Sequence, residues 1–143
     1  MPNVLLSGPA GAGKSQVARE ERLRSAEPAV IADFQSLYAA LSGDVRGPDG
    51  RYPLRDERLL PITEGLRLTV IAFAVQRGLR VIATNSDGDA DRRADLLRRL
   101  GPDSRERIAD PGRDVVTARL ADPATGDLSP ECDQAIGRWY DRL

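Results

Sequence analysis

Apolar and polar positions along this chain fall into two alternating kinds of segment. Short, continuous apolar runs, typical of strands buried on both faces of a sheet, lie at residues 3–7, 29–33, 79–84 and, more weakly, 105–109. Helical spacing of apolar residues lies at 13–24, 34–41, 63–77, 89–100, 113–120 and 130–143. Strands that alternate with helices predict an α/β fold: a doubly wound, mostly parallel sheet with helices on both faces.

Turn-forming residues separate these segments. Gly78 follows the third predicted helix and Gly101 follows the fourth, as expected at helix ends. Residues 42–61 are rich in glycine, proline and charge and predict a loop that faces a substrate, whereas residues 122–129 predict a connecting loop. The chain shows no internal repeat or linker, so we expect one domain over its whole length of 143 residues.

Composition narrows the classes of function. The 21 Lys and Arg residues nearly balance the 22 Asp and Glu residues, so the net charge of −1 does not support nucleic acid as a partner. One cysteine and no histidine exclude a disulfide framework and argue against zinc and haem sites. The first residues do not resemble a signal peptide, and no apolar run approaches about 18 residues, so we expect a cytoplasmic protein without a membrane segment.

One motif accounts for the single lysine of the chain. Of the 21 basic residues, 20 are arginine, and Lys14 stands in the run GPAGAGKS at 8–15, directly after the first predicted strand. This run satisfies the pattern G-x-x-x-x-G-K-[ST] of a phosphate-binding loop. A predicted strand before it and a predicted helix after it are the context that such a loop requires.

Each residue type in this run has a chemical reason. Glycines allow the backbone conformation that lets successive N–H groups converge on phosphate oxygens, and the following helix directs the positive end of its dipole at the same anion. Lys14 supplies a point charge for the β- and γ-phosphates, and the Ser15 hydroxyl is an oxygen ligand for Mg²⁺. We therefore expect ATP and Mg²⁺ to be bound by Gly8, Ala10, Gly11, Ala12, Gly13, Lys14 and Ser15.

The remaining pattern favours a kinase over other nucleotide-binding enzymes. A GTPase would need another lysine to read guanine, and the chain has none. A motor-type ATPase would need a strand that ends in adjacent acidic residues, and no predicted strand does so. A kinase needs a carboxylate at the end of the next strand to orient and deprotonate an acceptor hydroxyl, and Asp33 ends the second predicted strand.

Further polar residues fall at the same predicted edge of the sheet. Thr84 and Asn85 end the third strand, where the carboxyl ends of parallel strands face a ligand, and Arg92 and Arg93 follow on the next helix. Each residue also has a purely structural interpretation: Asp33 as a helix N-cap, the polar pair as caps of a turn, and the two arginines as surface cations.

At these residues the chain resembles the polynucleotide kinase and zeta-toxin-like clade of small P-loop kinases. The resemblance is carried by GPAGAGKS (8–15), VIADF (30–34), VIATN with DRR (81–93) and IADPGRDVVTARL (108–120). It implies a P-loop NTPase fold and ATP-dependent transfer of a phosphoryl group to a hydroxyl group. Short proteins that resemble this clade are often phage encoded and labelled as AAA-type ATPases.

The resemblance also implies roles for single residues. Asp33 stands where the family has its general base, Thr84 and Asn85 match the polar pair after the third strand, and Arg119 matches the arginine of a lid. Arg113 is an alternative lid arginine that would also contact the nucleotide. The expected catalytic residues are Lys14, Asp33 and Arg119.

Two positions depart from the family pattern. Ala83 stands where family members commonly have an aspartate, and Ser36 stands where polynucleotide 5′-kinases often have a substrate-binding arginine. The sequence therefore leaves three classes of phosphoryl acceptor: a nucleic-acid 5′ end, a nucleotide or another small hydroxyl compound. The alternative function is an ATP-binding or slow ATP-hydrolysing accessory module that acts through contacts with a partner.

Overall fold

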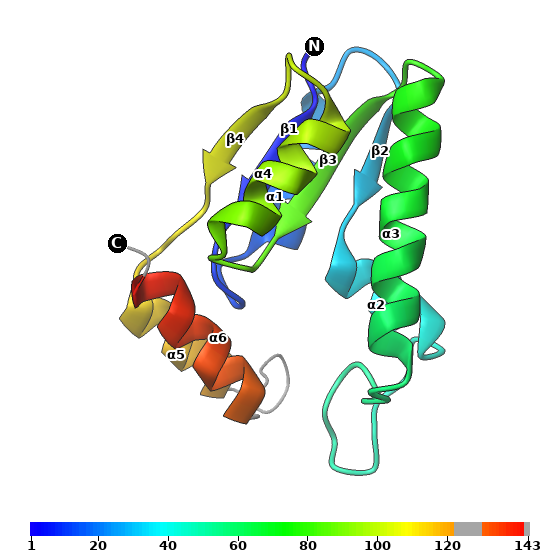
Figure 1. Cartoon of the computed structure of the whole chain (residues 1–143). Helices are drawn as coiled ribbons and strands as arrows, with labels where there is room; N and C mark the ends of the chain where they lie inside the picture. The colour runs from blue at the N-terminus through cyan, green and yellow to red at the C-terminus, as the bar shows by residue number, and fades with distance from the viewer. Residues whose placement is uncertain (122–129, 142–143) are drawn as a thin grey trace.

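The described part of the chain is built around one parallel sheet. The computed structural model describes residues 1–121 and 130–141, so the predicted connecting loop at 122–129 lies outside the described residues. The sheet has the order β2-β3-β1-β4, and its neighbouring strands are all parallel (Figure 1). The strands are β1 (Val4–Ser7), β2 (Ala29–Ala32), β3 (Arg80–Asn85) and β4 (Arg105–Ile108). The predicted parallel α/β fold is confirmed.

Helices cover both faces of this sheet. They are α1 (Lys14–Arg24), α2 (Phe34–Leu41), α3 (Leu59–Gln76), α4 (Ala90–Leu100), α5 (Arg113–Ala121) and α6 (Pro130–Asp141). Figure 1 shows α1 behind the sheet and α3 with α4 in front of it, whereas α5 and α6 lie beyond the carboxyl ends of the strands. The loop between α2 and α3 lies at that same end of the molecule.

Successive residues of β1, β2 and β3 point to opposite faces of the sheet, as the pleat requires. The cluster between the sheet and α3 with α4 contains Leu5, Ile71, Val81, Ala83 and Leu96. The cluster between the sheet and α1 contains Val4, Leu6, Ala18 and Ile82. Because β1 and β3 are buried on both faces, their sequences are continuous apolar runs.

The third helix begins earlier than the pattern predicts. It starts at Leu59 rather than at residue 63, so the predicted loop at 42–61 ends at residue 58. Pro61 lies in the first turn of α3, where its missing N–H costs no bond within the helix. The carbonyl of Asp56 accepts a hydrogen bond from the Leu59 N–H (3.0 Å) and so starts the first turn.

Among the described residues, α3 is long and apolar enough to cross a membrane, with a mean hydropathy of 1.3 over its 18 residues. In this structure it lies along the sheet instead (Figure 1). Ile71 and Ala74 are buried against the strands, and the charged Arg67 is buried as well. These are the contacts of a core helix in an α/β domain.

A close backbone approach at Gly8 provides a test of the packing of the strand ends. A Cβ atom added at Gly8 would lie 2.0 Å from the backbone carbonyl oxygen of Ala109, which follows β4. Gly8→Ala should force the ends of β1 and β4 apart and lower the free energy of unfolding by about 1–3 kcal/mol. Urea unfolding measures this change.

The matched control is Gly65→Ala in α3. An added Cβ atom at Gly65 would meet nothing within 4 Å. In the middle of a helix, alanine stabilises relative to glycine by up to about 1 kcal/mol, so this variant should be at least as stable as the wild type. Equal losses of stability in the two variants would contradict the close approach at Gly8.

Candidate functional site

The predicted phosphate-binding residues form one loop between β1 and α1. The Gly8 N–H donates to the carbonyl of Asn85 (3.0 Å), which connects the loop to the end of β3. Gly11 (φ 81°) and Gly13 (φ 85°) both have the left-handed backbone conformation that favours glycine. Gly13 is the N-cap of α1, so the loop runs from a strand directly into a helix, as predicted.

Lys14 lies inside this loop, with 8% of its surface exposed. Its Nζ donates to the carbonyl oxygens of Gly8 and Pro9, both at 2.7 Å. The Ala12 N–H donates to the carbonyl of Pro9 as well (3.1 Å), which closes the turn. The ammonium group is thus held within the loop that the motif predicts to surround the phosphates.

The first turn of α1 adds a favourable field for an anion. The N–H groups of Lys14 and Ser15 begin the helix and therefore have no acceptor within it. No acidic residue stands in this turn. Because the positive end of the helix dipole also lies here, the loop and the helix together suit a phosphate group.

Asp33 lies directly after β2 and is 2% exposed. Its Oδ2 accepts hydrogen bonds from the hydroxyls of Ser15 (2.7 Å) and Ser36 (2.6 Å), and its Oδ1 accepts one from the hydroxyl of Thr84 (2.7 Å). The Ser36 N–H also donates to Oδ2 (3.1 Å), so Asp33 is the N-cap of α2. Asp33 is therefore a helix cap and a neighbour of the phosphate loop at once.

Two opposing effects act on the pKa of Asp33. Burial raises the pKa, because it penalises the charged form. Hydrogen bonds from Ser36, Ser15 and Thr84 stabilise the carboxylate and together outweigh burial, so the pKa lies below its ordinary value of 3.8. At neutral pH Asp33 is an ionised hydrogen-bond acceptor and a weak base, which suits it to orient a hydroxyl group.

The oxygen atoms around Asp33 have the chemistry that a magnesium ion requires. The Ser15 and Thr84 hydroxyls and the carboxylate of Asp33 are hard oxygen donors, the type that Mg²⁺ prefers. Within residues 1–121 and 130–141, no group of three or more Asp, Glu, His or Cys side chains could hold a metal ion. Mg²⁺ at this position would therefore complete its coordination with phosphate oxygens and water.

The third strand contributes Thr84 to this cluster but not its neighbours. Ala83 is fully buried among apolar side chains on the opposite face of the sheet. Asn85 shapes the turn after β3, because its amide nitrogen donates to the carbonyl of Asp87 (2.9 Å) and its amide oxygen accepts from the Asp87 N–H (3.1 Å). Of the predicted polar pair, Thr84 contacts Asp33 and Asn85 does not.

Arg119 of α5 lies over the phosphate loop. Its Nη1 donates to the carbonyl of Gly11 (3.1 Å), and a Cβ atom added at Gly13 would lie 3.5 Å from the same nitrogen. Arg113, in contrast, lies over the ring of Tyr140, with its guanidinium carbon 5.6 Å from the ring centroid. Of the two predicted lid arginines, Arg119 is the one that contacts the loop.

An apolar contact holds α5 and α6 against the loop. Val116, Leu120 and Ile136 form a buried cluster, against which Ala10 of the loop packs. Tyr140 packs on the same cluster, and its hydroxyl donates to Asp110 (2.8 Å) in the segment before α5. The position of Arg119 therefore depends on the packing of both helices.

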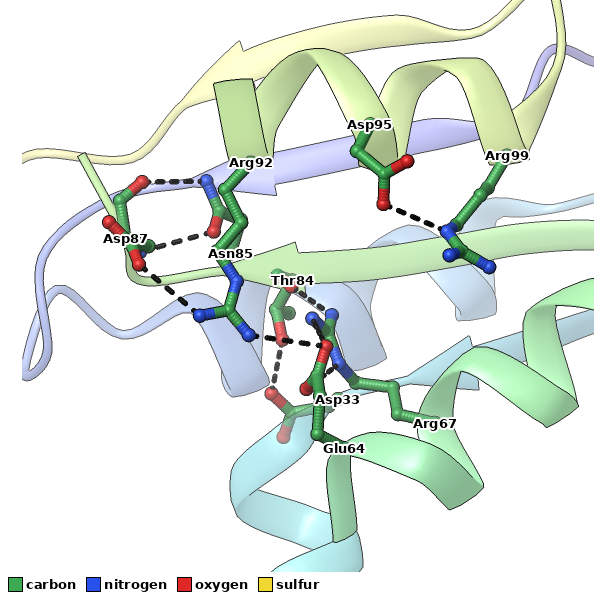
Figure 2. A network of polar contacts seen from close by, with 9 residues as sticks. All are labelled: Asp33, Glu64, Arg67, Thr84, Asn85, Asp87, Arg92, Asp95 and Arg99. Atoms are coloured by element: carbon green, nitrogen blue, oxygen red, sulfur yellow. Dashed lines mark hydrogen bonds and ion pairs between the residues drawn. The ribbon is translucent and has the colours of Figure 1, made fainter. Parts of the chain in front are cut away.

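Sequence reasoning missed two charged residues of α3 that reach this site. Arg67 is 4% exposed, and Figure 2 shows its guanidinium between Glu64 and the end of β3. Its Nε and Nη2 donate to the two carboxylate oxygens of Glu64 (3.0 and 2.9 Å), and its Nη1 donates to the carbonyl of Thr84. The signal that could have found them is a charged pair three residues apart inside an otherwise apolar helix.

The chain matches no protein-family model and no curated protein, but its fold is similar to solved structures. A chain of the Pnkp1/Rnl/Hen1 RNA repair complex aligns with 99% of this chain at a TM-score of 0.68 and 17% identity. A gluconokinase from Sinorhizobium meliloti aligns with 99% of it at a TM-score of 0.58 and 16% identity, over 74% of its own chain. The tunicamycin resistance protein of Deinococcus radiodurans aligns with 99% of this chain at a TM-score of 0.54 and 17% identity, over 78% of its own chain.

This chain has a P-loop NTPase fold. The similarity extends over nearly all of this chain, and two of the three matched proteins are covered over most of their length. The chain spans 44% of the matched RNA repair chain. The predicted fold class is thus confirmed by the sheet, by the phosphate loop and by the solved structures together.

The low pKa of Asp33 predicts how stability depends on pH. Because the pKa is lower in the folded chain than in the unfolded chain, the ionised side chain stabilises the fold above its ordinary pKa of 3.8, and this contribution is lost as the pH falls through the lower, folded pKa. Asp33→Asn removes the contribution. The difference in unfolding free energy between wild type and variant should be constant above about pH 5 and shrink in more acidic solution.

Urea unfolding of both proteins across this pH range measures the difference. Comparing the two proteins cancels the titration of all other carboxyl groups. A difference that stays the same down to about pH 2 would contradict a carboxylate stabilised by its hydrogen bonds.

Proposed function

We propose that this chain is a kinase that transfers the γ-phosphoryl group of ATP to a hydroxyl group, with Mg²⁺ as cofactor. The observation that carries this proposal is the hydrogen bond between the Ser15 hydroxyl and the Asp33 carboxylate (2.7 Å). It joins the phosphate loop to a buried carboxylate from the next strand. A nucleotide bound at the loop and an acceptor hydroxyl bound at Asp33 would then be neighbours, as phosphoryl transfer requires.

Each residue of the site has a part in this reaction. Lys14 and the loop amides bind the β- and γ-phosphates, and Arg119 covers the γ-phosphoryl group from α5. Ser15 would hold Mg²⁺, which when bound offsets the negative charge of the phosphates. The acceptor oxygen forms a new bond to the γ-phosphorus, the bond from that phosphorus to the bridging oxygen breaks, and ADP leaves.

Asp33 receives the hydroxyl proton in this scheme. In a loose transition state the acceptor oxygen becomes acidic late, once its bond to phosphorus forms, so a carboxylate with a low pKa can still take the proton. Before that step Asp33 orients the hydroxyl, which replaces the Ser15 hydroxyl as a donor, because the carboxylate already accepts four hydrogen bonds. Thr84 and Ser36 hold the carboxylate in place.

A second function, an ATP-binding or slowly hydrolysing accessory module, is favoured by Ala83. Ala83 supplies no carboxylate at this position of β3, and its methyl group is buried away from the site. The two functions differ in how ATP turnover responds to acceptors. A kinase turns over ATP faster when its acceptor is added, whereas an accessory module does not.

The lysine of the loop allows a test of ATP binding. Lys14→Ala removes a charged donor from the phosphates and should weaken ATP binding about tenfold to a hundredfold, the range expected for a charge-assisted hydrogen bond. Calorimetric titration with Mg-ATP measures the affinity, and circular dichroism checks the fold. Arg22→Ala, at the exposed last turn of the same helix, is the control and should bind ATP normally. Unchanged affinity in a folded Lys14→Ala protein would contradict the assignment of the loop.

The proposed lid can be tested at Arg119. A guanidinium fork can bridge two phosphate oxygens, which an ammonium cannot do in the same geometry. Arg119→Lys should therefore slow phosphoryl transfer about 10²–10⁴-fold while ATP affinity changes much less. Arg113→Lys, six residues earlier on α5 and directed at Tyr140, should have little effect.

Single-turnover transfer from labelled ATP, measured beside ATP affinity, gives both quantities. Loss of transfer in Arg113→Lys alone would move the lid role to Arg113. Normal transfer in both variants would mean that no arginine of α5 acts on the transferred group.

A further inference from the structure

A set of charged side chains lies beside Thr84, next to Asp33. Glu64 reaches there from α3, Asp87 from the turn after β3, and Arg92 from the first turn of α4 (Figure 2). Arg92 lies between the two carboxylates, with its Nη2 4.0 Å from Glu64 Oε1 and its Nη1 3.6 Å from Asp87 Oδ2. We call Glu64, Asp87 and Arg92 the acceptor cluster.

The acceptor cluster combines a fixed group with accessible ones. The carboxylate of Glu64 is fixed by its paired bonds to Arg67, whose side chain is 5% exposed. The side chains of the cluster are more open: 21% of Glu64, 36% of Asp87 and 55% of Arg92 are exposed. A ligand at the edge of the sheet can therefore reach all three.

These groups also retain hydrogen-bonding capacity. A carboxylate can accept about four hydrogen bonds, and Arg67 uses two positions on Glu64. The contacts of Arg92 to Glu64 and Asp87 are longer than hydrogen bonds, so they are ion pairs that leave its N–H groups able to donate elsewhere. A cation in the first turn of a helix opposes the helix dipole, so the two carboxylates are what favours Arg92 at this place.

The chemistry of the cluster indicates the class of its ligand. A hydroxyl group both donates and accepts, so neighbouring hydroxyls can donate to Glu64 and Asp87 while they accept from Arg92. The carboxylates of Glu64 and Asp87 are balanced by the guanidinium groups of Arg67 and Arg92. The cluster therefore has no excess positive charge that would attract a polyanion such as a nucleic-acid strand.

We propose that Glu64, Asp87 and Arg92 bind the acceptor and that the acceptor is a small, uncharged, polyhydroxylated molecule. This inference rests on the proposed kinase function, because it places the acceptor where one of its hydroxyls meets Asp33. Hydrogen bonds from the remaining hydroxyls to the cluster orient the reactive one. A nucleic-acid 5′ end is the alternative that the following experiment separates.

The experiment measures transfer from labelled ATP by the wild-type chain to two sets of probes. One set is neutral hexoses and hexitols, and the other is an RNA oligonucleotide with a 5′-hydroxyl. At least one neutral polyol should be phosphorylated with a kcat/KM about tenfold or more above that of the oligonucleotide. A higher kcat/KM for the oligonucleotide than for every polyol would overturn the proposed acceptor class. So would the absence of transfer to any polyol by a chain that binds ATP. A wild-type chain that does not bind ATP would overturn the kinase function itself.

Variants then test the cluster with the accepted polyol. Arg92→Gln should raise the KM for the polyol about tenfold with the KM for ATP unchanged, because it removes donors only from the acceptor side. Glu64→Gln should raise the KM for the polyol as well. Because Glu64→Gln also weakens the ion pair with Arg67, it can impair folding, and in that case Arg92→Gln alone tests the cluster. The control is Arg99→Gln on the same helix, where Arg99 pairs with Asp95 (2.9 Å) away from the site (Figure 2). An unchanged polyol KM in Arg92→Gln, or an equal rise in Arg99→Gln, would overturn the subsite.

Discussion

Hydrogen bonds that converge on the carboxylate of Asp33 hold the site together. They come from α1 through Ser15, from α2 through Ser36 and from β3 through Thr84. A buried carboxylate is stable only when its oxygens are satisfied, so the four donors to Asp33 must keep these positions for the fold to tolerate the charge. Stability and site geometry therefore depend on the same contacts, and the phosphate loop is placed relative to the next strand by a side chain that also caps a helix.

Much of the fold could be predicted because it is encoded locally. Continuous apolar runs marked β1, β2 and β3, and the glycine-rich motif between a strand and a helix identified the phosphate loop before any contact was known. The start of α3 could not be predicted in this way, since Pro61 is typical of a loop and is accepted in a first helical turn only because that turn needs no N–H donor there.

Beyond the phosphate loop, the site was predictable where sheet geometry decides it. Asp33 and Thr84 meet because neighbouring parallel strands end at the same edge, but Asn85 turns to the other side because side chains alternate along a strand. The choice between Arg113 and Arg119 depends on how α5 packs against the loop, and the contact of Arg67 with Thr84 depends on how α3 crosses the sheet. Tertiary packing of this kind leaves little trace in spacing or composition.

In the proposed kinase, the adjacency of Arg119 and Leu120 on α5 would make lid opening and loop exposure a single equilibrium. Arg119 donates to the Gly11 carbonyl, and Leu120 Cγ would lie 3.2 Å from a Cβ atom at that same glycine. An outward movement of α5 that releases the arginine must also uncover the leucine, and exposing a buried leucine costs about 1.5–3 kcal/mol. A nucleotide that drew Arg119 inward would thereby favour the closed apolar cluster, so part of its affinity would be the free energy of packing α5 and α6 against the loop.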